Sequence, residues 1–208
     1  SSAVILDSLV ARQGTRGSVR GRGRVNLDGF ALQSYRFDLA LRNLAASEPG
    51  LYAAPFDGDF VVTNGPRVGG QTLPRVEGRA RIKQAAILFN FSNQSEVQQI
   101  AAVTQPLFWT YNIQLEANDR LNWRPPEGDI EFNADLRLEQ SRDSLSIYGE
   151  MHALRGSYWF LSNKFNIQSV DLTFDNVEGA NPVIDAIAIT RVSPSVDASI
   201  GATPDVNP

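Results

Sequence analysis

Few residues in this chain could do catalytic chemistry. Its 208 residues contain one histidine, His152, and no cysteine. We therefore find no Ser-His-Asp or Cys-His arrangement and no histidine-rich metal site. His152 follows Met151 in a strand-like segment, and a general base needs a partner within reach, so we expect an ordinary solvated or hydrogen-bonded residue. The composition predicts a protein that is not an enzyme and has neither a metal nor a cofactor.

Two carboxylates in the segment Asp57-Gly58-Asp59 could suggest a calcium site. Calcium requires six or more oxygen ligands, and too few acidic residues follow the segment to supply them. Asp-Gly is also a common turn dipeptide. We therefore expect a tight turn at Asp57-Gly58, and another at Asn64-Gly65-Pro66.

The formal net charge of the chain is only −4, but a cluster of arginines near its start is locally positive. Glycines separate these arginines and no acidic residue lies among them. Three roles are open: a solvated irregular strand, a surface for anionic lipid or a partner, and RNA binding. RNA binding would call for stacking aromatics, and the run has none, so we expect no nucleic-acid partner. The run comprises Arg12, Arg16, Arg20, Arg22 and Arg24.

Three tryptophans provide the largest apolar side chains. Filling a core is the default role of such residues. Their positions near predicted strand ends also suit a membrane interface or a protein contact. The sequence therefore offers Trp109, Trp123 and Trp159, together with Arg12, Arg16 and Arg20, as candidates for a partner or membrane surface.

Most of the chain after Arg24 has the period-two alternation of β-strands. Between Ile130 and Glu139, apolar residues alternate with polar ones, so one face of the strand is apolar and the other is polar and solvent-exposed. Sheets of this kind are usually antiparallel. We expect about twelve strands in a meander, with a short helix or flexible insertion at Ser95 to Thr104.

Neither a membrane-spanning segment nor a signal peptide is evident. No run approaches the roughly 18 apolar residues that would span a bilayer, and Ser1 is not followed by a charged region and an apolar core. Either the protein is soluble, or the chain is a piece from which a membrane anchor has been left out. We expect the second, because the first residues read like a strand that begins in its middle.

The order of short motifs resembles the C-terminal domain of the TamB proteins, AsmA-like envelope proteins of diderm bacteria. The most specific stretches are Arg155 to Phe160, Phe165-Asn166-Ile167, Leu172-Thr173-Phe174 and Asn181-Pro182. The family continues past the Asn-Pro strand towards an outer-membrane barrel, whereas Ser193 to Pro208 is rich in Pro and Ser, so we expect a truncated relative. We divide the chain into an Arg/Gly-rich entry strand or linker (1–24), a TamB-like domain (25–192) and a tail (193–208).

The resemblance implies an all-β fold, a single curved and mainly antiparallel sheet forming an open groove with little helix. It also implies a non-catalytic role on the periplasmic face of the envelope, in which the groove handles lipid acyl chains or outer-membrane protein segments. The expected partner is a membrane protein complex or an outer-membrane assembly barrel. The alternatives are a structural accessory subunit, an ordinary sandwich core in place of the groove, and an enzyme, which the missing catalytic groups disfavour. The expected groove-lining residues are Tyr35, Phe37, Leu39, Phe132, Leu136, Leu138, Val170, Leu172 and Phe174.

Overall fold

The computed structural model describes residues 2–48, 52–88, 109–141, 144–178 and 182–191, and within these ranges the chain forms eleven strands and no helix. Within these residues, no helix has the length and apolar character needed to span a bilayer. The first six strands are β1 (Ser2–Gln13), β2 (Gly17–Asp28), β3 (Ala31–Glu48), β4 (Tyr52–Val68), β5 (Gln71–Ile82) and β6 (Ala85–Ile87). The other five are β7 (Thr110–Trp123), β8 (Gly128–Ser141), β9 (Ser144–Phe160), β10 (Asn163–Glu178) and β11 (Val183–Thr190).

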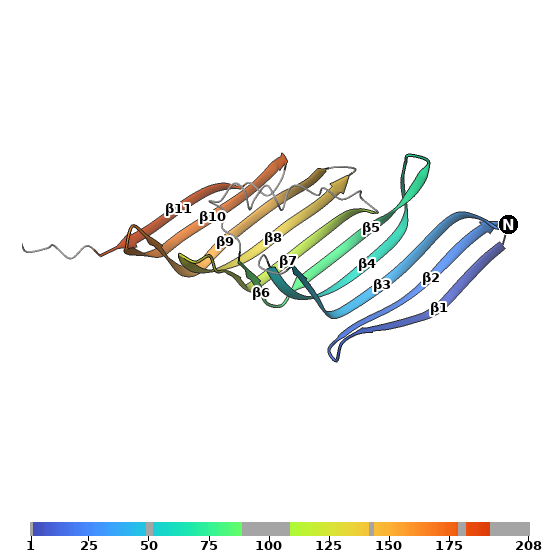
Figure 1. The fold of residues 1–208 in the computed structure, drawn as a ribbon, viewed down its shortest axis with the longest axis horizontal. Helices are drawn as coiled ribbons and strands as arrows, with labels where there is room; N and C mark the ends of the chain where they lie inside the picture. The colour runs from blue at the N-terminus through green and yellow to red at the C-terminus, as the bar shows by residue number, and fades with distance from the viewer. Residues whose placement is uncertain (1, 49–51, 89–108, 142–143, 179–181, 192–208) are drawn as a thin grey trace, which may run out of the picture.

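All eleven strands belong to one sheet, in which the spatial order follows the chain (Figure 1). Neighbouring strands are antiparallel except where β7 pairs with β5 and β6, because β7 runs parallel to both. The short strand β6 pairs with β4 on one side and β7 on the other, beyond the end of β5. β5 and β6 thus act as one interrupted strand. The expected single, mainly antiparallel sheet is confirmed.

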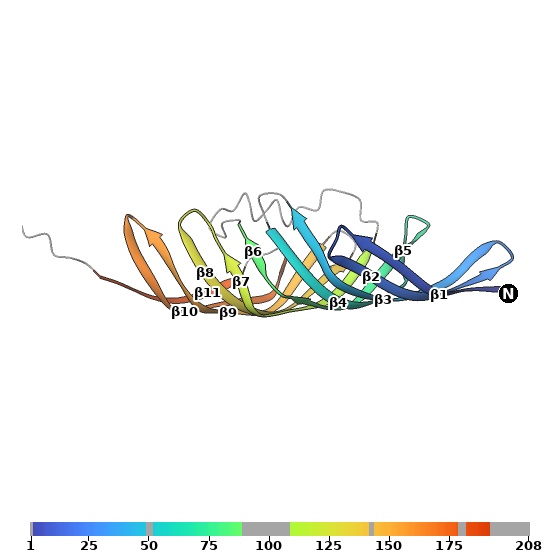
Figure 2. The ribbon, with the colours of Figure 1, turned by 90° about the horizontal axis from the view of Figure 1, so that it is seen from below.

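The sheet is open and curved. Figure 2 shows the strand ends bending up on one side along the length of the sheet. β1 and β11 lie at opposite ends of the strand order, so each is an edge strand. Apolar side chains on both edges are exposed, including Val4, Ile5, Val183 and Ile187.

The buried core lies on one face of this sheet. Eleven residues from β6 to β10 form one cluster, which includes Ile130, Phe132, Met151 and Leu172. The strand registers place these side chains on the same face. Because the sheet bends towards this face, its side chains pack against one another although the sheet is a single layer. We call this the apolar face, and the opposite one the charged face.

Two expected turns are wrong. Asp57-Gly58 and Asn64-Gly65-Pro66 both lie inside β4, which continues to Val68 before the chain turns at Gly69-Gly70. Asp57 and Asp59 pair in register with Arg81 and Arg79 of β5. Their cross-strand partners thus outweigh the local turn preference of Asp-Gly. The helix or insertion expected at Ser95 to Thr104 lies outside the described residues.

Candidate functional site

Continuous cross-strand rows make up the apolar face. One row crosses nine strands from β1 to β10, with each residue directly opposite the next. Its members are Ala11, Val19, Leu41, Gly58, Ala80, Leu115, Leu136, Gly149 and Phe174. Because every member is apolar or glycine, the row forms an uninterrupted apolar band across the sheet.

The nine residues expected to line a groove share this face. Leu39 lies opposite Phe60, and the same row continues through Gly78 and Ile113 to Leu138. Five of the nine are buried, namely Phe132, Leu136, Val170, Leu172 and Phe174. The other four, Tyr35, Phe37, Leu39 and Leu138, are partly exposed. That they hold a ligand stays a prediction.

The apolar face has two different halves. In the half from β6 to β10, the core cluster packs tightly enough to leave Phe132 only 1% exposed and Met151 only 2%. In the half from β2 to β5, the described side chains lie outside that cluster, apart from Ala54 and Ile82, which pack against it. We call these the filled half and the open half.

Large side chains lie flat over glycines in the open half. A Cβ added at Gly23 would be 2.2 Å from the Phe37 ring, and one at Gly21 would be 2.6 Å from Leu39. Phe60, which is buried, covers Gly78 on β5 and also Gly58 two residues earlier in its own strand. Such pairing of a large residue with a glycine on the next strand makes a smooth apolar floor and favours a tight bend.

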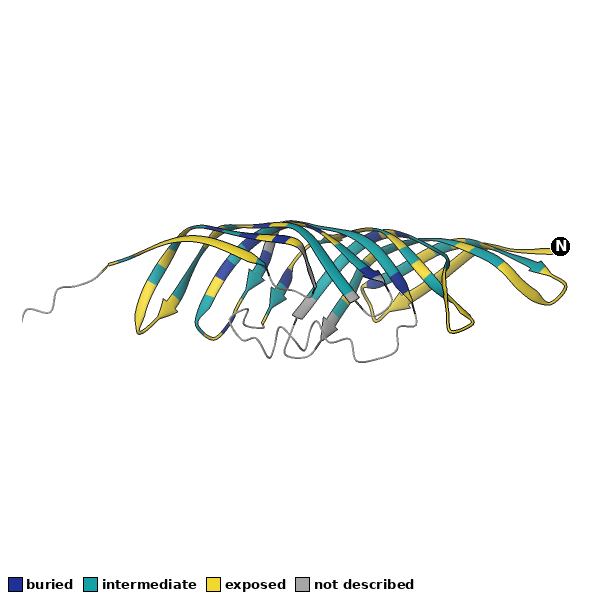
Figure 3. Ribbon diagram, turned by 90° about the horizontal axis from the view of Figure 1, so that it is seen from above, coloured by how far each residue is buried: buried dark blue, intermediate teal, exposed yellow. Residues whose placement is uncertain are grey.

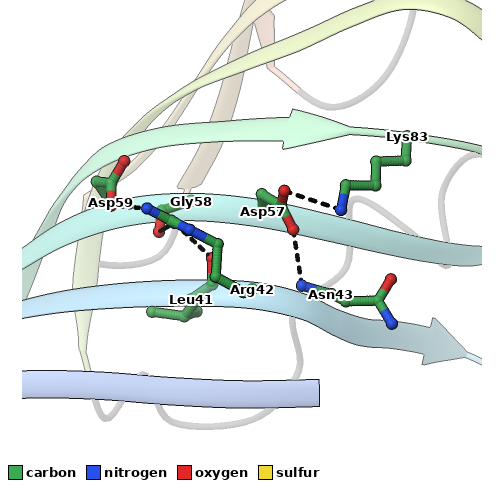
Figure 4. Close-up of polar contacts among 7 residues, drawn as sticks. All are labelled: Leu41, Arg42, Asn43, Asp57, Gly58, Asp59 and Lys83. Atoms are coloured by element: carbon green, nitrogen blue, oxygen red, sulfur yellow. Dashed lines mark hydrogen bonds and ion pairs between the residues drawn. The ribbon is translucent and has the colours of Figure 1, made fainter. Parts of the chain in front are cut away.

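Charged pairs that bridge neighbouring strands cover the opposite face. Figure 4 shows Lys83 and the backbone N–H of Asn43 both binding Asp57, at 2.9 and 2.7 Å. Arg42 binds Asp59 at 3.1 Å and also donates to the carbonyl of Gly58. Burial alone would raise the pKa of Asp57, but the Asn43 N–H, followed by Lys83 and Arg42, together lower it. Asp57 and Asp59 therefore act as structural links between strands. Within the described residues, no group of three or more acidic, histidine or cysteine side chains could hold a metal ion.

His152 lies on the charged face between two carboxylates. Its Nδ1 is 2.6 Å from Asp171 Oδ1, and its Nε2 is 3.2 Å from Glu150. The hydrogen bond to Asp171 is the main reason why the pKa of His152 is raised, against a smaller lowering by burial, and Glu150 adds to the rise. Sequence reasoning missed this trio, although His152 and Glu150 have the i, i+2 spacing that places two residues on one face of a strand.

Five of the six expected partner-surface residues are exposed, and the tryptophans lie apart from the arginines. Arg12 and Arg20 lie in β1 and β2, and Arg16 lies in the turn between them. Trp109 and Trp159 are half exposed, whereas Trp123 stacks on Tyr158 with ring centroids 6.1 Å apart. Trp109 directly precedes β7 and Trp123 ends it, so the three tryptophans do not form one patch.

Taken together, these features define a class of protein: an open, curved, single-sheet β protein with one apolar and one charged face. The chain belongs to the TamB C-terminal domain family, whose model matches residues 7–207. This is a non-enzymatic family of bacterial envelope proteins. Comparisons with curated proteins and with solved structures found no match.

Proposed function

We propose that the open half of the apolar face holds lipid acyl chains, or apolar segments of outer-membrane proteins, during envelope assembly. The observation that carries this proposal is the partly exposed apolar floor of β2 to β5, built from Phe37, Leu39 and Val62. Burying about ten CH₂ groups of an acyl chain there would contribute roughly 8 kcal/mol before the costs of association. This gain needs no directed polar contact, which suits a protein that handles varied chains.

A photo-crosslinking side chain at Phe37 tests this proposal, and Arg36 gives a matched control. The two residues are neighbours in β3, but Phe37 points to the apolar face and Arg36 to the charged face. Leu136 is a second control, because it lies on the apolar face within the filled half. In bacterial membrane extracts, the Phe37 position should capture lipid or a peptide, and mass spectrometry would tell these apart.

Arg36 and Leu136 should capture neither ligand. Equal capture at Phe37 and Arg36, or no capture at Phe37 under conditions that label a known lipid carrier, would contradict the proposal. Capture at Leu136 in place of Phe37 would place the ligand in the filled half, against the burial pattern described above.

The second candidate is a structural accessory subunit of a larger membrane complex on the periplasmic face of the envelope. Two observations favour it: the filled half is already a packed core, and both edge strands expose apolar residues. An open edge can pair with a strand of a partner through main-chain hydrogen bonds. Replacing Val4 in β1 with proline should then release the protein from its complex with little effect on the fold, because proline is tolerated at an edge. Unchanged co-purification of the variant would count against this candidate.

A further inference from the structure

The charged face of β1 to β3 carries a cluster of arginines that the groove does not explain. Since Arg20, Arg22 and Arg24 alternate along β2, their side chains lie on one face. Arg12 lies beside them on β1, opposite Ser18, and Arg36 lies on β3, directly opposite Arg24. We call these five residues the arginine patch.

Acidic side chains neutralise little of this patch. Asp38 binds both Arg36, at 2.9 Å, and Arg22, at 3.8 Å. Arg12 and Arg20 have no ion pair within the described part of the chain. Like charges directly opposite each other, such as Arg24 and Arg36, destabilise a strand pair. The patch therefore keeps an excess of positive charge at some cost to stability.

Elsewhere on the charged face, several arginines have acidic partners. Arg79 and Arg81 both bind Glu116, and Arg155 binds Glu131 at 2.5 Å. The contrast extends to the whole chain. Residues 1 to 48 contain seven arginines and four acidic residues, a formal charge of +3, whereas the whole chain has −4, which leaves −7 for the remainder. Positive charge is thus concentrated at one end of a negatively charged protein.

Exposed apolar side chains accompany the arginines. Val10 of β1 lies opposite Arg20, and Ile5 lies opposite Arg24; their exposed fractions are 61% and 65%. Phe30 is fully exposed in the turn between β2 and β3, next to the exposed Leu32. Figure 3 shows β1 and this turn as largely exposed at the N-terminal end of the sheet.

We propose that the arginine patch docks on an anionic phospholipid surface, with Ile5 and Val10 of the same face and Phe30 of the adjoining turn entering the interface. Guanidinium groups match phosphate well, and exposed aromatic and aliphatic side chains suit the headgroup level of a bilayer. This combination favours lipid over nucleic acid, which would use aromatics interleaved with the arginines. The proposal goes beyond the groove, because it concerns the opposite face.

Co-sedimentation with vesicles tests this proposal. The protein should bind vesicles of phosphatidylcholine mixed with phosphatidylglycerol, bind pure phosphatidylcholine weakly, and lose affinity as salt rises. Each arginine near an anionic surface contributes about five-fold in affinity, so replacing Arg20, Arg22 and Arg24 with glutamine should weaken binding by on the order of 100-fold. Replacing the same three with lysine should retain most of the binding.

The matched control is the pair Arg79→Gln and Arg81→Gln, which removes two arginines from the same face outside the patch. It should leave vesicle binding nearly unchanged. Photo-crosslinking at Phe37 reports on the groove separately, so failure of this proposal and failure of the groove proposal are distinguishable. No vesicle binding, equal losses in the patch and control variants, or binding of RNA or acidic protein without vesicles would overturn the docking proposal.

Discussion

His152 of β9 and Asp171 of β10 lie directly opposite each other, with the imidazole Nδ1 2.6 Å from the carboxylate. They come from segments 19 residues apart and meet because the register of the two strands aligns them. The pair joins two strands on the charged face, directly behind the filled half of the apolar face. Its contribution to stability should therefore depend on pH.

The pKa of His152 is raised from the ordinary 6.5, so the stability that its protonation contributes is complete below about pH 6.5 and is lost as pH rises through the folded-state value. Because the chain has a single histidine, NMR titration of its imidazole is unambiguous. In Asp171→Asn, the pKa should fall back towards 6.5. The difference in melting temperature between wild type and this variant should be larger at pH 5.5 than at pH 8.5. An unchanged imidazole pKa in the variant would show that Asp171 is not the cause.

Asp57 and Asp59, two residues apart on the charged face, should differ in their importance for stability. Asp57 accepts two hydrogen bonds and is 26% exposed, whereas Asp59 is 73% exposed with one arginine partner. Asp57→Ala should lower the free energy of unfolding by about 2 kcal/mol, and Asp59→Ala by less than about 1 kcal/mol. Urea denaturation at pH 7 measures both values. Since the pKa of Asp57 is lowered, its contribution is present above the unfolded-state value of 3.8 and is lost as pH falls through the folded-state value. Equal effects of the two substitutions would contradict the assignment.

The filled half should behave as a true core. Phe132 is 1% exposed within the cluster, so Phe132→Ala should lower the free energy of unfolding by about 4 kcal/mol through lost burial and a cavity. Phe30→Ala makes the same chemical change at a fully exposed site and should alter stability by less than about 0.5 kcal/mol. Chemical denaturation of both variants gives the comparison. A small loss for Phe132→Ala would mean that this half is loosely packed.

Gly149 should tolerate no side chain. Its φ is +114°, and an added Cβ would be 2.1 Å from the backbone oxygen of Asp135. Gly149→Ala should therefore cost about 3 kcal/mol, since strain adds to the overlap. Gly29, with φ +60° and no atom within 4 Å of an added Cβ, gives the control, and Gly29→Ala should cost about 1 kcal/mol. Thermal unfolding would rank the two variants, and a similar loss in both would show that the strand at Gly149 can shift.

Local alternation was enough to predict much of this fold. In β8, Ile130, Phe132, Ala134 and Leu136 are buried, while their neighbours Asp135 and Arg137 are exposed, as the sequence pattern indicated. The period of two determines which face each side chain occupies, whatever the strand pairs with. Runs of Arg and Gly in β2 follow the same rule, which is why the arginines share a face.

Pairing between distant segments decided what the sequence could not. Asp57-Gly58 has the composition of a turn, yet the cross-strand partners Arg81 and Ala80 keep it within a long strand. The parallel pairing of β7 with β5 and the approach of Asp171 to His152 likewise depend on register, which no local pattern contains. The sequence by itself determined the two faces, one apolar and one charged. Only the tertiary structure decided that the apolar face has a filled and an open half, because burial depends on how far the sheet bends and on which strands meet within the bend.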